Sequence, residues 1–328
     1  MQGLACAAGA LAVSPLLASC KARASYGTPA NITLVLDYTP NTNHIGIYVA
    51  LAKGYYEDAG INLNIEQPPE DGADALVGFG NVEFGISFQD WMANYLGSKT
   101  PLPVTAVAAI LQHNTAGIMS LREADITSAA MMQNKRYGSQ DNACDQAIVK
   151  AIMIHDGIIH PELTMLNASG LDELSALQAN LFDCIEVFAG WGLQNAYIQD
   201  ILVNFFYLRD QVSVFDFYTP VIIANNSFLE QEADLVRAFL KATAQGYQDA
   251  ARDPLKATQL LVEQVPELAG ELTERSAIYL ADYFLTQDKR WGVFSAERWS
   301  RFYSWMNDEN LTRVPLVPDK GFSNAYLS

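Results

Sequence analysis

The chain has 328 residues, of which 50% are hydrophobic and 17% are charged, and its formal net charge at pH 7 is -17. This composition excludes a disordered chain, because disordered segments have few hydrophobic residues. The acidic balance and the lack of any basic run exclude nucleic acid as a partner, since a phosphate backbone is bound by clustered Lys and Arg.

The first twenty residues have the pattern of a targeting segment. Residues 4–17 form an apolar run that is too short to span a membrane but suits a signal peptide. The run ends in Leu17-Ala18-Ser19-Cys20, which resembles the lipid-attachment motif of bacterial lipoproteins and predicts a membrane anchor through a lipid on Cys20. No Lys or Arg precedes it, so we expect the natural start to differ. Residues 21–30 are predicted to be a linker.

From residue 30 onward, strand and helix patterns alternate, which is typical of an open, mostly parallel sheet in an α/β protein. Short apolar runs predict strands at residues 32–36, 63–66, 84–87, 104–111, 117–120, 136–138, 164–166, 184–188, 203–207 and 219–224. Helices are expected between them at residues 46–59, 72–79, 90–97, 145–156 and 171–180.

After residue 225 the chain is predicted to be helical. Ser227 is expected to cap a helix through Gly246, Pro254 to open a second helix, and Ser295 to cap a helix over residues 296–307. Three large side chains of this last helix recur at helical spacing and are expected in the core: Trp299, Tyr303 and Met306.

The four cysteines are scattered. Cys6 falls in the targeting segment and Cys20 at the anchor, which leaves Cys144 and Cys184 in the folded body. A disulfide between them is open from sequence, and two buried free thiols are the simpler expectation. Neither the cysteine spacing nor the four His residues gives a metal signature, so we expect no metal and no cofactor.

Polar and aromatic residues gather in two segments that follow predicted strands. A strand-loop-helix unit directs side chains and free helix N–H groups into a crevice at the carboxyl end of a sheet, so both segments indicate a ligand site. The first segment holds Asp37, Tyr38, Asn41, Asn43 and His44, and the second holds Ser87, Gln89, Asp90 and Trp91. The alternative for the Asn and His residues is a structural role in a turn.

The residues of these segments resemble a known family. YTPNTNH at 38–44, QPPEDG at 67–72 and FGISFQDW at 84–91 are similar to the substrate-binding proteins of ABC importers for thiamin pyrimidine precursors, a pyrimidine synthase-like family that also includes riboflavin-binding importers. The resemblance covers most of residues 32–327. The family also includes a fungal pyrimidine synthase. The resemblance to its transport members implies an extracytoplasmic, monomeric protein that passes a small heteroaromatic ligand to an ABC permease.

The resemblance also implies a type II periplasmic-binding-protein fold, with two α/β lobes joined by a two-strand hinge. Residues 31–115 and 218–328 would form lobe 1, and residues 116–217 lobe 2. A flat ligand between the lobes needs aromatic faces and a few polar groups that bind its edge. The further candidates for these roles are Gly138, Asp141, Trp191, Gln194, Asp216 and Tyr218.

One departure from the family pattern bears on the ligand. Family members place an acidic residue directly after the tryptophan that matches Trp191, and this chain has Gly192 there. Gln194, Glu186 and Asp216 are the candidates to replace that carboxylate at an aminopyrimidine edge. Riboflavin or another flat heterocycle is therefore an alternative ligand.

An enzyme like the fungal pyrimidine synthase is the second alternative. That enzyme carries the cysteine-rich motif CCCFC, and this chain has no clustered cysteines. Lys53 lies in Ala52-Lys53-Gly54-Tyr55-Tyr56, which resembles a helix-end segment common to the transport members, and it is expected to be a surface cation instead of a cofactor-binding lysine. We therefore expect a binding protein.

Overall fold

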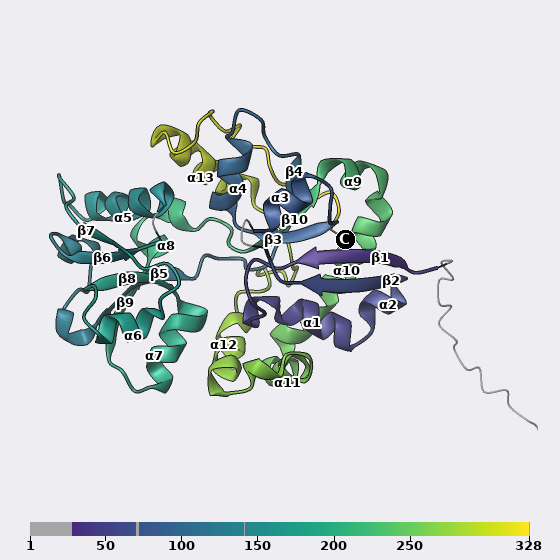
Figure 1. Ribbon diagram of the computed structural model, residues 1–328, viewed down its shortest axis with the longest axis horizontal. Coiled ribbons are helices and arrows are strands. Elements are labelled where there is room, and N and C mark those ends of the chain that lie inside the picture. Colours follow the sequence, from purple (N-terminus) through teal and green to yellow (C-terminus); the bar gives the residue numbers. More distant parts are fainter. Residues whose placement is uncertain (1–27, 70–71, 141, 328) are drawn as a thin grey trace, which may run out of the picture.

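The computed structural model describes residues 28–69, 72–140 and 142–327. The targeting segment with Cys20, most of the predicted linker, and Asp141 lie outside the described residues. The elements of the described part form two α/β lobes that lie next to each other (Figure 1).

Each lobe contains one mixed sheet of five strands. The first sheet has the order β2-β1-β3-β10-β4, formed by β1 (Ala30–Val35), β2 (Ile61–Glu66), β3 (Phe84–Ser87), β4 (Val104–Ala109) and β10 (Val221–Asn225). The second has the order β7-β6-β8-β5-β9, formed by β5 (Ala116–Leu121), β6 (Arg136–Ser139), β7 (Thr164–Asn167), β8 (Cys184–Phe188) and β9 (Val203–Tyr207). All ten predicted strands are confirmed.

Two chain segments connect the lobes, because β10 returns to the first sheet after β9 has completed the second. The segments run side by side: the Ile110 N–H donates to the Pro220 carbonyl at 3.0 Å, and the Asn114 N–H donates to the Asp216 carboxylate at 2.9 Å. This paired crossing is visible between the lobes in Figure 1. It is the hinge of the molecule.

Helices cover the sheets. The first part of the chain contributes α1 (Ile45–Ala52), α2 (Tyr55–Asp58), α3 (Ala73–Gly78) and α4 (Gln89–Leu96). The second lobe carries α5 (Ala143–His155), α6 (Glu173–Gln178), α7 (Gln194–Ile198) and α8 (Leu208–Gln211). The last part adds α9 (Asn226–Gln231), α10 (Ala233–Arg252), α11 (Pro254–Gln264), α12 (Glu271–Ala281) and α13 (Ala296–Asp308).

Local signals explain most helix ends, with two corrections. The single helix predicted over residues 46–59 is broken, because Gly54 has φ of 72° and starts α2 separately. Ser227 does not cap α9; the Asn225 side chain accepts from the Ser227 N–H. Pro254 opens α11 and Ser295 caps α13, as predicted.

The large side chains predicted for the core are buried there. Trp299, Tyr303 and Met306 lie on the inner face of α13, each at most 1% exposed. Cys144 and Cys184 are both buried and free, so the expectation of two separate thiols is confirmed. The last segment of the chain thus completes the core of the first lobe instead of forming a separate domain.

Candidate functional site

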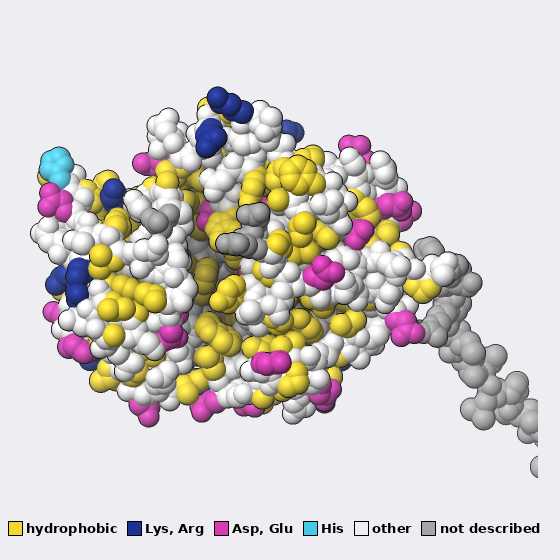
Figure 2. All heavy atoms as spheres, viewed as in Figure 1, with side chains coloured by type: hydrophobic (Ala, Val, Ile, Leu, Met, Phe, Trp, Pro, Cys, Tyr) yellow, Lys and Arg dark blue, Asp and Glu magenta, His cyan; other side chains and the backbone are white. Residues whose placement is uncertain are grey.

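The two lobes point their strand ends at each other. β1 and β3 are parallel in the first sheet, and β6 and β8 are parallel in the second. The loops that follow these four strands lie at the junction of the lobes, and Figure 2 shows a groove there with hydrophobic side chains in its depth. Parallel strands place ligand-binding loops at their carboxyl ends, so this groove is the candidate site.

The loop after β1 is held in shape by its own side chains. The His44 Nδ1 accepts from the Asn41 N–H at 3.1 Å, so the proton sits on Nε2, which donates to the Asp37 carboxylate at 2.6 Å. The Asn41 side chain accepts from the Asn43 N–H at 2.9 Å. Asp37, Asn41 and His44 therefore build the loop, and their polar atoms are largely used there.

Two other residues of this loop have side chains available to a ligand. The Tyr38 ring is 67% exposed. Asn43 is half-buried; its backbone N–H donates to Asn41 and its carbonyl accepts from the Tyr247 hydroxyl at 2.6 Å, whereas its side chain has no hydrogen-bond partner among the described residues. The rigid framework of the loop fixes where these two side chains stand.

The residues after β3 also fall into two groups, those that support the fold and those that lie beyond them at the start of α4. Ser87 is buried and donates to Asp74, at 2.8 Å for the nearer carboxylate oxygen. Gln89 is fully buried; its side chain accepts from the Tyr218 N–H and donates to the Trp299 carbonyl. Ser87 and Gln89 thus support the fold, whereas Asp90 and Trp91 lie beyond them at the start of α4.

The hinge candidates are also engaged in structure. The Tyr218 ring is 1% exposed and packs among core rings, and its hydroxyl accepts from the Ser295 N–H at 2.7 Å. Asp216 accepts from the Asn114 N–H and lies 2.8 Å from the His113 ring nitrogen. We leave Tyr218 and Asp216 out of the proposed site for this reason.

In the second lobe, two of the predicted residues have close structural neighbours and a third is half-buried. A side chain at Gly138 would meet Phe182 at 3.0 Å, so this glycine permits close packing. Gln194 is buried and donates to the Ala189 carbonyl at 3.0 Å within the turn that follows β8. Trp191, in the same turn, is half-buried and forms no ring contact with the described residues.

Aromatic rings with free faces come from both lobes. Tyr38 and Trp91 belong to the first lobe, and Trp91, 44% exposed, forms a T-shaped contact with Phe88. Phe188, also 44% exposed, ends β8 and lies three residues before Trp191. Phe188 was not predicted; its position at the end of a strand was the available signal. These rings supply stacking surfaces for a flat ligand.

Carboxyl groups of the two lobes influence each other's pKa. Burial and the nearby Asp145 and Asp90 carboxylates raise the pKa of Glu186 to about 8. Burial also raises the pKa of Asp90 to about 6, and the Asp74 and Asp145 carboxylates add to this rise. Asp90 belongs to the first lobe and Asp145 and Glu186 to the second, so acidic groups of both lobes lie near enough to raise each other's pKa.

The environments of these carboxyl groups differ. Asp145 accepts from the Tyr137 and Ser139 hydroxyls, both at 2.6 Å, and from the Gln140 N–H. Glu186 has no hydrogen-bond partner among the described residues, although it lies in the otherwise apolar strand β8. A lone acidic residue in such a strand is the sequence signal that singles it out. The Glu186 carboxyl oxygens are thus available to form hydrogen bonds with a ligand.

We expect the free energy of unfolding to increase as the pH is lowered from 9 to 5. The pKa of Asp74 is also raised by burial to about 6. For Asp74, Asp90 and Glu186 the folded-state pKa exceeds the unfolded value near 4, so their contribution is complete below about pH 4 and is lost as the pH rises through about 6 and about 8. Urea midpoints measured across this range would show the trend.

Glu186→Gln provides the control for this pH dependence. The variant should lose the part of the slope between pH 7 and 9, because its amide does not titrate. Carboxyls with a lowered pKa, such as Asp183 beside Arg136, titrate below this range. Midpoints that rise with pH between 6 and 9 would contradict the burial of these acids.

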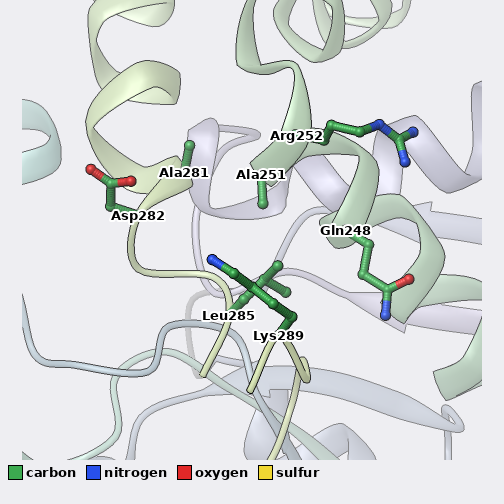
Figure 3. Close-up of a pocket in the computed structure, with 7 residues that line it drawn as sticks. All are labelled: Gln248, Ala251, Arg252, Ala281, Asp282, Leu285 and Lys289. Atoms are coloured by element: carbon green, nitrogen blue, oxygen red, sulfur yellow. The ribbon is translucent and has the colours of Figure 1, made fainter. Parts of the chain in front are cut away.

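A second hollow lies elsewhere, on the outer side of the first lobe between α10, α12 and the following loop. Its volume is about 260 Å³. Figure 3 shows the side chains of Arg252 and Asp282 on opposite sides of the opening, so its polar groups do not converge. None of the predicted site residues lines it, and we assign it no ligand.

Two further properties concern the described residues alone. They contain no group of three or more His, Cys, Asp or Glu side chains arranged to hold a metal ion. No helix in residues 28–69, 72–140 and 142–327 combines the length and apolar character needed to cross a bilayer.

Two α/β lobes, a paired hinge crossing and a groove between facing strand ends define a periplasmic-binding-protein fold. The structure is similar to the periplasmic aliphatic sulphonate binding protein SsuA from Escherichia coli, with a TM-score of 0.66, 12% identity, and coverage of 91% of this chain and 99% of that chain. The NMT1/THI5-like family matches residues 41–257, and the chain belongs to this family.

Relatives in sequence have two kinds of activity. The formylaminopyrimidine-binding protein of Halalkalibacterium halodurans is 23% identical over 94% of this chain and 94% of its own length. The 4-amino-5-hydroxymethyl-2-methylpyrimidine phosphate synthase THI11 of Saccharomyces cerevisiae is 25% identical over 90% of this chain and 88% of its own length. Both names refer to a substituted pyrimidine.

Proposed function

We propose that this protein is the extracytoplasmic substrate-binding component of an ABC importer, and that it captures a formylamino- or hydroxymethyl-substituted aminopyrimidine between its lobes. The proposal is supported by exposed aromatic rings in both lobes and by carboxyl groups of both lobes that raise each other's pKa. A ligand that contacts both lobes favours the closed form, and closure is what a permease recognises.

Glu186 supplies the carboxyl group that family members carry at the position of Gly192. A side chain at Gly192 would come within 2.9 Å of the Val187 Cβ, so the turn after β8 has no room for an acid there. With its pKa near 8, Glu186 is protonated at neutral pH and offers an O–H donor beside a carbonyl acceptor. This pair matches a ring nitrogen next to an exocyclic amine. Asp90 can accept a second proton of such an amine.

Binding is favoured over catalysis by the residues around Lys53. Its ammonium group lies 2.6 Å from the Asp249 carboxylate at the surface of the first lobe, and the Tyr55 hydroxyl donates to the same carboxylate. An amine held in this ion pair is a surface cation. The scattered cysteines of the sequence also differ from the clustered motif expected of a synthase.

The motif at Cys20 supports a lipid-anchored protein on the outer face of the membrane, where such binding proteins meet their permease. The same proposal makes the protein a monomer, because each chain contains both lobes of the groove. An ABC permease is then the protein partner.

A thermal-shift titration tests the proposed ligand. The probes are 4-amino-5-hydroxymethyl-2-methylpyrimidine, its formylamino relative, thiamin, riboflavin and taurine. A pyrimidine present at a hundred times its Kd should add about 2.7 kcal/mol to the free energy of unfolding. Trp191→Ala should weaken binding by about 1 to 3 kcal/mol, because a stacking face is lost.

Phe79→Ala is the matched control, since this ring is exposed at the end of α3 and lies outside the groove. It should bind like the unaltered protein. If riboflavin alone raised the midpoint of thermal unfolding, the proposed ligand would be a larger flat ring instead of a pyrimidine. Unchanged affinity in Trp191→Ala would remove this residue from the site, and a coloured protein that loses its colour on Lys53→Ala would favour the enzyme.

A further inference from the structure

Helix α12 connects the two lobes outside the hinge. Its residues Ala277 and Leu280 belong to the core of the first lobe. Tyr279, on the same helix, also packs against the small core of the second lobe. A side chain at Gly190 would come within 2.8 Å of Leu280, so the turn that carries Trp191 lies directly on this helix.

Three tyrosine hydroxyls extend this contact across the junction. The Tyr207 hydroxyl, at the end of β9 in the second lobe, lies 2.8 Å from the Tyr279 hydroxyl. Tyr279 donates to the Tyr283 hydroxyl at 3.2 Å. Each hydroxyl has one proton, so Tyr207 donates to Tyr279 and the three groups form a directed chain.

The Arg209 guanidinium group contacts the last tyrosine of this series. Arg209 of the second lobe donates to the Tyr283 hydroxyl at 3.2 Å and to the Asn114 carbonyl in the hinge. Its central carbon lies 4.0 Å from the centre of the Tyr207 ring and 5.3 Å from that of Tyr283. Cations over aromatic faces are attracted by them, and Arg209 therefore holds rings of both lobes together.

One turn before Tyr279, the middle of α12 contacts the loop after β1. The Ser276 hydroxyl lies 2.5 Å from the Thr42 hydroxyl, and both groups are buried. One helix thus contacts the loop that carries Tyr38 and Asn43 and the turn that carries Trp191. A rotation of the lobes about the hinge must change at least one of these contacts, because α12 is fixed in the first lobe.

We propose that Tyr207, Arg209, Tyr279 and Tyr283 form an interlobe latch that holds the lobes at the present angle without a ligand. The latch positions the Trp191 turn opposite the loop after β1 through α12. It raises the fraction of molecules with the present lobe arrangement before a ligand arrives, which increases the apparent affinity of the groove for any ligand that binds this arrangement.

The interlobe distance in the ligand-free protein tests this proposal. Spin labels are placed on exposed helix positions of the two lobes with Lys150→Cys on α5 and Lys241→Cys on α10, in the full chain carrying Cys6→Ser and Cys20→Ser. Cys144 and Cys184 are buried. The expected result for the parent is one narrow distance distribution.

Tyr279→Phe removes both hydroxyl contacts and keeps the ring, and Arg209→Gln removes the cation. Either variant should broaden the distribution toward longer distances, with the ratio of molecules with separated lobes to molecules in the present arrangement raised by roughly tenfold. Tyr55→Phe is the matched control: it loses one hydroxyl contact, to Asp249, within the first lobe and should leave the distribution unchanged.

Unchanged distributions in both Tyr279→Phe and Arg209→Gln would overturn the latch, as would an equal broadening in Tyr55→Phe. Far-ultraviolet circular dichroism of each variant verifies folding before the distances are compared. Since no ligand is present, the result is independent of the proposed function: the latch can fail while the groove still binds a pyrimidine, and the reverse also holds.

Discussion

Glu186→Ala is expected to lower the affinity for 4-amino-5-hydroxymethyl-2-methylpyrimidine by about ten- to a hundredfold. The reason is the loss of the donor and acceptor pair in a groove where a ligand's unpaired polar edge costs about 1 to 3 kcal/mol. Burial and the Asp145 and Asp90 carboxylates keep this acid protonated at neutral pH. Isothermal calorimetry at pH 7 measures the change.

Glu186→Gln separates the protonated acid from the carboxylate. An amide also presents a donor beside an acceptor, so this variant should retain most of the affinity at pH 7. The unaltered protein should lose affinity as the pH rises above about 8, where Glu186 ionises, and the amide variant should not. Equal losses in Glu186→Ala and Glu186→Gln would show that the charged form binds the ligand, and no loss in either would remove Glu186 from the site.

The second large effect concerns the crossing of α1 and α10. Gly246→Val should lower the free energy of unfolding by about 3 kcal/mol or more. The added side chain overlaps α1, so the two helices must move apart and lose packing contacts. A Cβ at position 246 would overlap the Gly46 carbonyl oxygen and come within 2.9 Å of the Ala50 backbone. Urea unfolding, with the slope of the transition compared between variants, measures the loss.

Gln245→Val is the control for this substitution, since it places the same β-branched residue at the neighbouring exposed position of α10. It should cost well under half as much. The crossing also matters for the groove, because Tyr247 donates to the Asn43 carbonyl in the loop after β1. Equal costs for the two variants would show that helix propensity, not packing, dominates.

The local elements were accessible from sequence. Apolar runs bounded by turn residues predicted the strands, and Pro254 and Ser295 marked helix starts, because these signals depend on neighbours along the chain. The amphipathic spacing of Trp299, Tyr303 and Met306 predicted their burial for the same reason. The break at Gly54 was missed, since its left-handed backbone competes with an otherwise helical pattern.

The sequence indicated which segments hold the candidate site, but it did not indicate which residues of those segments are available to a ligand. The loop after β1 and the start of α4 were singled out, but sequence does not distinguish Asn41, which builds its loop, from Asn43, whose side chain stays available. Gln89 was expected at a ligand, and its amide instead joins the Tyr218 and Trp299 backbones, more than a hundred residues away. Such partners depend on how distant segments pack.

The sequence by itself determined the alternation of strands and helices, the acidic surface and the position of the site segments, because each is set by residue types and short-range spacing. Only the tertiary structure decided that the Asp90 and Asp145 carboxylates act on Glu186, and that α12, predicted only as part of a helical region without bounds, brings Tyr279 to Tyr207. Burial and proximity between lobes shift a pKa or join two hydroxyls, and neither quantity exists until the lobes are packed together.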